Sequence, residues 1–134
     1  MANVPVGSAR EDNLMVTGEV AIAFMGVEDA RVLGTPHLIA HLEYNARNLV
    51  LGFLEPGYDT VGTHVNVAHL AATPIGMNVR LRAEVLSVED RRVNLKVEAW
   101  DDLEKIAEGT HERFIVNAKR FGARVQEKAA QVRA

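Results

Sequence analysis

The segment from Thr35 to Leu54, TPHLIAHLEYNARNLVLGFL, decides the fold because it has the pattern of one long amphipathic helix. Thr35 is the predicted N-cap, since its hydroxyl can accept a hydrogen bond from a free amide of the first turn, and Pro36 suits the first helical position. At about 100° per residue, the apolar side chains fall on one arc of roughly 120°. They are Leu38, Ile39, Leu42, Ala46, Leu49, Val50 and Phe53, with His41, Asn45 and Asn48 on the polar side.

Glu43 lies at the edge of this apolar arc rather than on the polar side of the predicted helix. A carboxylate beside a buried stripe lowers stability unless it is paired or hydrogen-bonded. Two interpretations are open: a functional carboxylate, or a side chain that extends to solvent at the rim of the stripe.

Composition narrows the class of protein. The chain has 134 residues, of which 48% are hydrophobic and 25% charged, with a net charge of −3. These values are typical of a folded globular protein and favour neither nucleic acid nor a membrane surface as a partner. The absence of cysteine excludes disulfides and thiolate catalysis. No apolar run of about 18 residues and no signal pattern is present, so a cytoplasmic location is expected.

The remaining chain is mostly predicted strand. Residues 1–12 are interpreted as a flexible N-terminal leader, and residues 13–134 as a single domain. Period-two alternation predicts a first strand at Leu14–Phe24 and four more after the helix, and helical spacing returns at the end. The later strands are expected at residues 60–70, 77–88, 93–100 and 106–116, and the last helix at 119–132.

The order of elements predicts an α+β fold. Strands joined by short turns pair antiparallel, and the single long helix must bury its apolar arc against their sheet. A sheet curled around one central helix is the hotdog arrangement. Because one helix cannot cover both faces and the edges of such a sheet, we expect a homodimer.

Three polar side chains are predicted to meet at the seam between helix and sheet. His69 has the same parity as Val65 and Val67 and should point from its strand into the seam, Glu43 should point into it from the helix, and Thr35 lies at the helix start. A hydroxyl, a carboxylate and an imidazole together suit acyl transfer. Each also has a plain structural interpretation: a core histidine, a rim glutamate and a capping threonine.

The same residues give the chain a resemblance to the fluoroacetyl-CoA thioesterase-type family of hotdog-fold acyl-CoA thioesterases. It covers roughly residues 32–128 and rests on Thr35 with Glu43, on Val61-Gly62-Thr63, on the segment VAHLAATP at 67–74 with Gly76, and on GTHER at 109–113.

The resemblance implies hydrolysis of an acyl-CoA thioester to a carboxylate and CoA. It also implies that Thr35, Glu43 and His69 are catalytic, that Gly62 presents its backbone N–H to the thioester carbonyl, and that no cofactor is needed. Residues 26–34 contain no aromatic side chain, so a small or medium acyl-CoA is expected rather than fluoroacetyl-CoA.

Several alternatives to this interpretation are open. A non-catalytic acyl-CoA sensor would keep the fold without turnover, and a hotdog enoyl-CoA hydratase would need an Asp/His pair that is not evident, with Asp59 interpreted as a turn residue. His37 and His41 have a spacing that can hold a metal, but without a third ligand they favour a solvated pair. Arginines at 80, 82, 91 and 92 either meet CoA phosphates or form a solvated face.

Overall fold

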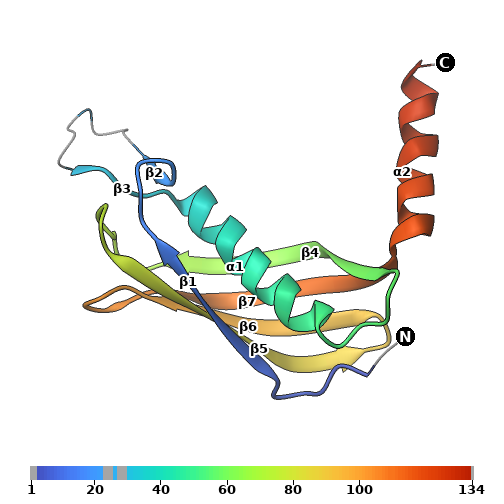
Figure 1. Cartoon of the computed structure of the whole chain (residues 1–134), viewed down its shortest axis with the longest axis horizontal. Helices are drawn as coiled ribbons and strands as arrows, with labels where there is room; N and C mark the ends of the chain where they lie inside the picture. Colours follow the sequence, from blue (N-terminus) through green and yellow to red (C-terminus); the bar gives the residue numbers. More distant parts are fainter. Residues whose placement is uncertain (1–2, 23–25, 27–29, 134) are drawn as a thin grey trace.

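The predicted long helix is present and crosses one face of a sheet (Figure 1). In the computed structural model, which describes residues 3–22, 26 and 30–133, this helix is α1, Thr35–Leu51. It ends at Leu51, three residues before the predicted end at Leu54; Gly52 is its C-cap, and a turn follows. Gly34, not Thr35, is its N-cap, so the threonine hydroxyl is not used for capping.

The buried face of α1 agrees with the predicted arc in most positions. Its buried residues are Leu38, Leu42, Asn45, Ala46, Leu49 and Val50, while Ile39 is half-buried and Phe53 lies beyond the helix and is exposed. Asn45 was predicted on the polar side, and that assignment is wrong. Its side-chain amide donates to the Asp12 carboxylate at 2.7 Å and to the Arg10 carbonyl at 3.1 Å, which compensates its burial.

The main sheet has five antiparallel strands in the order β1-β5-β6-β7-β4. Their bounds are β1 Ala9–Met15, β4 Tyr58–His69, β5 Asn78–Glu89, β6 Arg92–Trp100 and β7 Lys105–Asn117. The strands β2, Ala21–Ile22, and β3, Val32–Leu33, pair separately. The sheet curls around α1 as the predicted hotdog arrangement requires (Figure 1). Strands β4 and β5 are not neighbours, because residues 70–77 carry the chain between opposite halves of the sheet.

The N-terminal segment differs from the prediction. Strand β1 begins at Ala9, and Val4 is buried in the core, so the interpretation of residues 1–12 as a loose leader is wrong from Val4 onward. The apolar pattern missed this strand because its polar residues are held by backbone pairing with β5. The predicted strand Leu14–Phe24 is divided between β1 and β2, and Phe24 lies outside the described residues.

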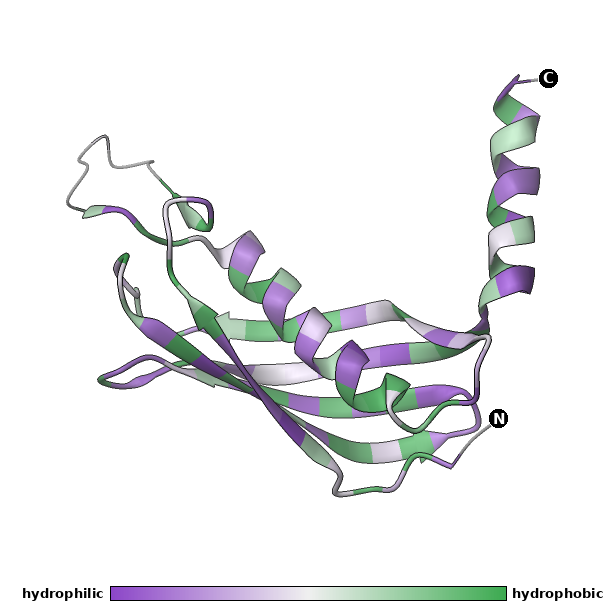
Figure 2. Ribbon diagram, viewed as in Figure 1, coloured by the Kyte–Doolittle hydropathy of each residue, from purple (hydrophilic) through white to green (hydrophobic). Residues whose placement is uncertain are grey.

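The predicted core of strands β5 and β6 is confirmed, and hydrophobic residues alternate with hydrophilic ones along the ribbon of these strands in Figure 2. The inward residues are all buried: Val79, Leu81, Ala83, Val85, Val93, Leu95, Val97 and Ala99. They form one cluster with the buried face of α1. This is the burial that α1 and the sheet provide for each other.

Strand β4 contains an irregularity that changes which side chains share a face. Its pairing with β7 shifts between Gly62 and His64, so Thr63 is an extra residue in the strand. Thr60 and Gly62 therefore share a face with Val65, Val67 and His69. Val61, predicted on the face of Val65, lies on the opposite one because the extra residue reverses the parity.

The predicted final helix is α2, Ala118–Arg133, and none of its described residues is buried. Figure 1 shows α2 extending past the β4 edge of the sheet, away from the rest of the chain. Its apolar side chains at Phe121, Val125 and Val132 are exposed. None of the described helices is long and apolar enough to cross a membrane.

We predict that Asn45→Ala lowers stability by about 1–3 kcal/mol, because it removes two buried hydrogen bonds that tie α1 to β1. Burial alone would raise the pKa of Asp12, but hydrogen bonds from Arg10 and Asn45 outweigh it and lower that pKa. In thermal unfolding at neutral pH, the Tm of Asn45→Ala should therefore be several degrees below that of the parent protein. Asn48→Ala, on the same helix, is the control and should stay within about 0.5 kcal/mol of the parent. Equal Tm values for the two variants would contradict this role.

Candidate active site

Thr35 and His69 form the first half of the site. The Thr35 Oγ1 lies 2.7 Å from the His69 Nδ1. Because Gly34 caps α1, the Thr35 hydroxyl is free to make this contact. His69 ends β4 on the face turned toward α1, as predicted from its parity with Val65 and Val67. When the imidazole is neutral and Nδ1 accepts, this pair has the arrangement of a hydroxyl held by its general base.

The second ring nitrogen of His69, Nε2, is buried and has no hydrogen-bond partner among the described residues. Burial lowers the pKa of His69, against a smaller raising effect of the Ala71 backbone. The imidazole is therefore neutral at pH 7 and able to accept a proton. An unpaired buried nitrogen is costly unless a ligand or water uses it, which makes this ring a candidate ligand-binding group.

A pocket of about 310 Å³ opens beside this pair. Its polar lining is Thr35 and His69, and its remaining walls are Ile22, Val32, Leu33, Leu70, Ala71 and Ala72. The 70–77 segment is held in place by β3, because the Leu33 N–H donates to the Thr73 carbonyl at 2.9 Å. The Thr73 hydroxyl in turn donates to Asp101 at 2.9 Å. A small apolar group can therefore lie against a hydroxyl and an imidazole.

Glu43 and Gly62 form the second half of the site. A Cβ added to Gly62 would lie 2.7 Å from the Glu43 Oε2, so β4 passes close to the carboxylate at this position. The Glu43 side chain is 37% exposed and forms an ion pair with Arg113 at 3.3 Å. Glu43 is therefore not an unpaired glutamate at the rim of the apolar stripe. It forms an ion pair with Arg113, whose side chain is largely buried.

Arg113 is fixed by a buried network that the sequence analysis missed. Its Nε donates to the Thr60 hydroxyl at 2.7 Å and its Nη2 to the Thr60 carbonyl at 2.9 Å. The His111 Nδ1 lies 2.8 Å from the His64 carbonyl and must donate to it, so the neutral ring accepts from Arg113 at Nε2, 3.2 Å away. Burial lowers the pKa values of both His111 and Arg113. One sequence feature could have indicated this network: His111, Arg113 and the inward Ile115 are spaced two residues apart, so all three share one face of the strand.

The two halves are separated within one chain. Thr35 and Glu43 are eight residues apart on α1, which corresponds to about 12 Å along the helix axis. Gly62 and His69 are separated by roughly 20 Å along β4 once the extra residue is discounted. The structure thus brings Thr35 to His69 and Glu43 to Gly62, but it does not bring the two pairs together in one protomer.

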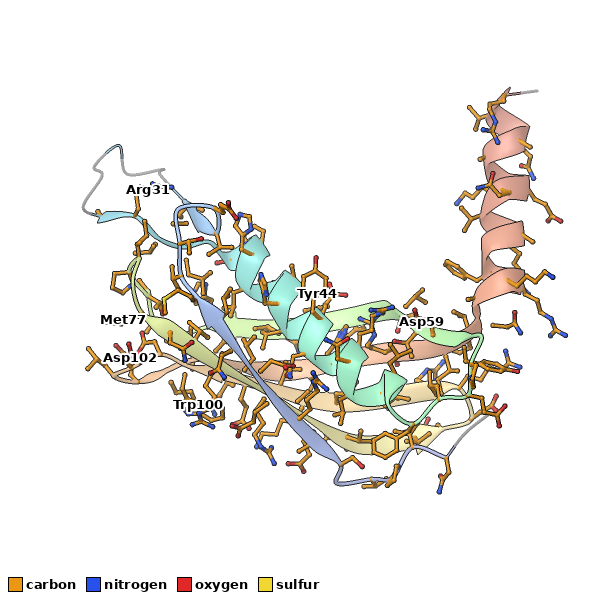
Figure 3. All side chains as sticks on the ribbon, in the orientation of Figure 1. Arg31, Tyr44, Asp59, Met77, Trp100 and Asp102 are labelled. Carbon is orange, nitrogen blue, oxygen red and sulfur yellow. The ribbon has the colours of Figure 1, made fainter. Side chains whose placement is uncertain are left out.

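The other candidates from the sequence have structural surroundings of their own. His41 packs edge-to-face on Tyr44, and the described part of the chain holds no group of three metal-ligating side chains. Asp59 is not a turn residue: it lies in β4 beside α1 (Figure 3) and accepts from Arg47 at 2.6 Å. It is therefore already paired with a structural partner.

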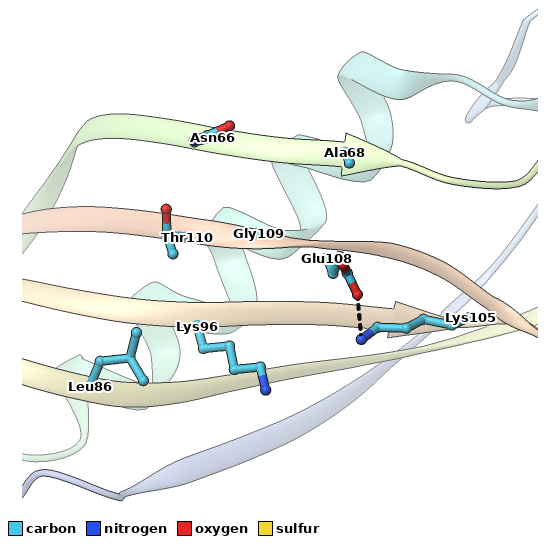
Figure 4. Close-up of a pocket in the computed structure, with 8 residues that line it drawn as sticks. All are labelled: Asn66, Ala68, Leu86, Lys96, Lys105, Glu108, Gly109 and Thr110. Atoms are coloured by element: carbon cyan, nitrogen blue, oxygen red, sulfur yellow. Dashed lines mark ion pairs between the residues drawn. The ribbon is translucent and has the colours of Figure 1, made fainter.

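A larger hollow, of about 500 Å³, lies on the sheet face opposite α1 (Figure 4). Its lining includes Asn66, Leu86, Lys96, Lys105 and Glu108. Lys105 is neutralised by Glu108 at 2.7 Å and by Glu98 at 2.8 Å. The hollow lacks a nucleophile held by a base, so its size does not make it the candidate active site.

Comparisons with known proteins agree with the fold and with the thioesterase class. Residues 16–119 match the family described as fluoroacetyl-CoA-specific thioesterase. A fluoroacetyl-CoA thioesterase of Streptantibioticus cattleyicolor is 38% identical over 101 residues, which are 75% of this chain and 73% of that protein.

Solved structures extend the match to nearly the whole chain. The fluoroacetyl-CoA thioesterase FlK superposes with a TM-score of 0.85 at 31% identity, covering 94% of this chain and 98% of that one. A hypothetical protein of Thermus thermophilus, described as a thioesterase superfamily member, gives a TM-score of 0.89 at 29% identity, with 99% and 98% covered. The resemblance inferred from the sequence and the thioesterase class are confirmed. The chain belongs to the fluoroacetyl-CoA-specific thioesterase family of hotdog-fold enzymes.

Proposed function

We propose that this protein is a homodimeric thioesterase for small acyl-CoA substrates, with each active site shared between two protomers. Thr35 and His69 of one protomer face Glu43 and Gly62 of the other. The observation that carries the proposal is the Thr35–His69 contact of 2.7 Å at the mouth of an apolar pocket. Among the described residues, no other hydroxyl makes a hydrogen bond with a histidine ring.

The chemistry follows from this pair. His69 takes the proton of the nucleophile, which is the Thr35 hydroxyl or a water molecule beside it, as a bond forms to the thioester carbonyl carbon. The carbonyl oxygen gains negative charge, which the Gly62 N–H stabilises. The C–S bond then breaks, and the CoA thiolate receives the proton from His69. With Thr35 as nucleophile, the Glu43 carboxylate of the other protomer takes a proton from a water molecule, which attacks the acyl carbonyl in a second step; the acyl group leaves as the carboxylic acid, and the Thr35 oxygen regains its proton.

The free edge of the sheet supports a shared site. Strand β4 has β7 on one side only, and its residues from Gly62 to Asn66 are exposed. A long unprotected edge strand is suited to pairing with a second copy. If two β4 strands pair antiparallel with Asn66 opposite Asn66, and Thr63 is discounted as the extra residue of the bulge, the register places His69 opposite Gly62 of the partner. The extra residue at Thr63 puts both of these on the α1 face.

The position of α2 supports the same dimer. This helix extends past the β4 edge at the Tyr58 end of the strand (Figure 1). In the proposed dimer, the two-fold axis places the opposite end of the partner's sheet, including its β6–β7 turn, next to α2. Leu103 in that turn is 78% exposed. Much of the apolar stripe of α2 is also exposed to solvent. Pairing would cover both apolar surfaces.

The size of the pocket favours a small acyl group. Its walls are aliphatic, and its approximately 310 Å³ must also hold the thioester and the attacking oxygen. The described lining contains no aromatic side chain. We therefore propose short aliphatic acyl-CoA thioesters as substrates, without assigning fluoroacetyl-CoA.

We predict that His69→Ala lowers the rate of thiol release from acetyl-CoA by roughly 10²–10⁴-fold, because the variant lacks the proton acceptor. His37→Ala, at an exposed position on α1, is the control and should retain the parent rate. The measurement is spectrophotometric detection of free CoA. Turnover by His69→Ala at the parent rate would contradict the catalytic role of His69. If the parent protein binds acyl-CoA but releases no thiol, the protein is a sensor and not a thioesterase.

The pH dependence should report the same imidazole. Because burial lowers the pKa of His69, the neutral base form persists below the ordinary histidine value of about 6.5. We therefore expect kcat/KM to stay constant as pH falls through 6.5 and to decline only in more acidic solution. A decline that begins well above pH 6.5 would contradict a neutral His69 as the base.

The shared site predicts complementation between two inactive variants. Glu43→Gln removes the carboxylate and His69→Ala removes the imidazole, so each homodimer should be inactive. In a mixed dimer carrying one variant per protomer, one site receives both substitutions and the other is intact. Differently tagged chains, co-expressed and purified as the mixed dimer, should recover about half of the parent rate. A mixed dimer without activity would place the site within one protomer.

A further inference from the structure

A cationic cleft lies at the base of α2, between the end of β7 and the β5–β6 turn. Three arginines line it, Arg91, Arg120 and Arg124, together with Phe114 and Phe121. The cleft measures about 100 Å³, and the Phe121 side chain is 41% exposed. It is separate from the Thr35–His69 pocket and shares no lining residue with it.

These three arginines differ from most others because no carboxylate in the described part of the chain pairs with them. Elsewhere the guanidinium groups are matched with acids, at Arg10, Arg47, Arg80, Arg82, Arg92 and Arg113. Three positive charges in one cleft repel each other unless an anion joins them. The arrangement is therefore complementary to a ligand with several negative charges.

We propose that this cleft binds the nucleotide half of CoA, with its phosphate groups on Arg91, Arg120 and Arg124. The proposal rests on the acyl-CoA thioesterase function proposed above. Guanidinium groups donate paired hydrogen bonds to phosphate oxygens, and an exposed phenylalanine ring offers a face on which adenine can stack. The combination of clustered arginine and aromatic side chains fits a nucleotide better than it fits inorganic phosphate.

The position of the cleft suits a substrate whose thioester lies at Gly62. Phe114 pairs with Val61, the residue before Gly62, and Val116 of the cleft pairs with Asp59, so the cleft lies on the sheet face away from α1. It is roughly 10 Å along the strand from the Gly62 half of the site, which lies on the α1 face. The pantetheine arm of CoA is a flexible chain that joins its nucleotide to its thioester, and the proposal requires it to pass around the β4 edge between Tyr58 and Val61, outside the segment that pairs with the partner. Of the arginines singled out in the sequence, only Arg91 is left unpaired for this role.

The test compares substrates with and without the nucleotide. The double variant Arg120→Gln/Arg124→Gln should raise the KM for acetyl-CoA roughly ten- to a hundredfold, because it loses charge-assisted hydrogen bonds to phosphate. The KM for S-acetyl-pantetheine, which lacks the nucleotide, should change less than about twofold. Arg133→Gln is the matched control, since Arg133 is on the same helix, is unpaired and lies outside the cleft.

Calorimetric titration with CoA separates this proposal from the thioesterase proposal. Weaker CoA binding by the double variant supports the cleft even if the parent protein shows no turnover. Inorganic phosphate as competitor shows whether the cleft requires a nucleotide: equal affinity for phosphate and CoA would indicate a general anion site and overturn nucleotide recognition. Unchanged CoA affinity, or equal KM changes for both substrates, would also overturn the proposal.

Discussion

The site depends on the β-bulge at Thr63 in strand β4. Gly62 and His69 are seven positions apart, and in a regular strand without this bulge they would point to opposite faces of the sheet, because side chains alternate along a strand. With it, both face α1, and a two-fold axis at Asn66 can place the imidazole of one protomer opposite the glycine of the other. A bulge beside a functional site is a common way to aim a side chain. Here the bulge determines which face of the sheet each side chain in one half of β4 points to.

The second constraint is the burial of Arg113. A buried cation needs a complete set of partners, and Thr60, His111 and Glu43 supply them. The carbonyl of His64, next to the bulge, fixes the tautomer of His111, so the irregular backbone and the ion pair form one network. This network holds the Glu43 carboxylate beside Gly62 and explains why a charged side chain is stable at the rim of an apolar helix face. The same arrangement connects fold and chemistry, since the strand that positions His69 also positions Glu43 through Arg113.

Much of the fold was predictable from local patterns. The helix face and the inward residues of β5 and β6 follow from periodicity, because each of these elements has one side in the core. The polar strand β1 and the buried Asn45 could not be predicted in this way, since backbone pairing and hydrogen bonds replace apolar burial there. Thr35, His69, Glu43 and Gly62 were singled out from spacing and resemblance. Their division into two distant pairs, and the network of Arg113, depend on the bulge and on strand order, which involve contacts between residues far apart in sequence.

The register of the two β4 strands is the central claim, and the cysteine-free chain allows a direct measurement of it. In the proposed dimer Asn66 faces its own counterpart, on the sheet face away from α1, with Cβ atoms about 4.5–5.5 Å apart. The variant Asn66→Cys should therefore form a disulfide between protomers under mild oxidation and retain thioesterase activity. Ala68→Cys, two residues along the same face, should remain a free thiol because His64 of the partner lies opposite it. A cross-link through position 68 with none through position 66 would contradict the proposed register and, with it, the shared active site.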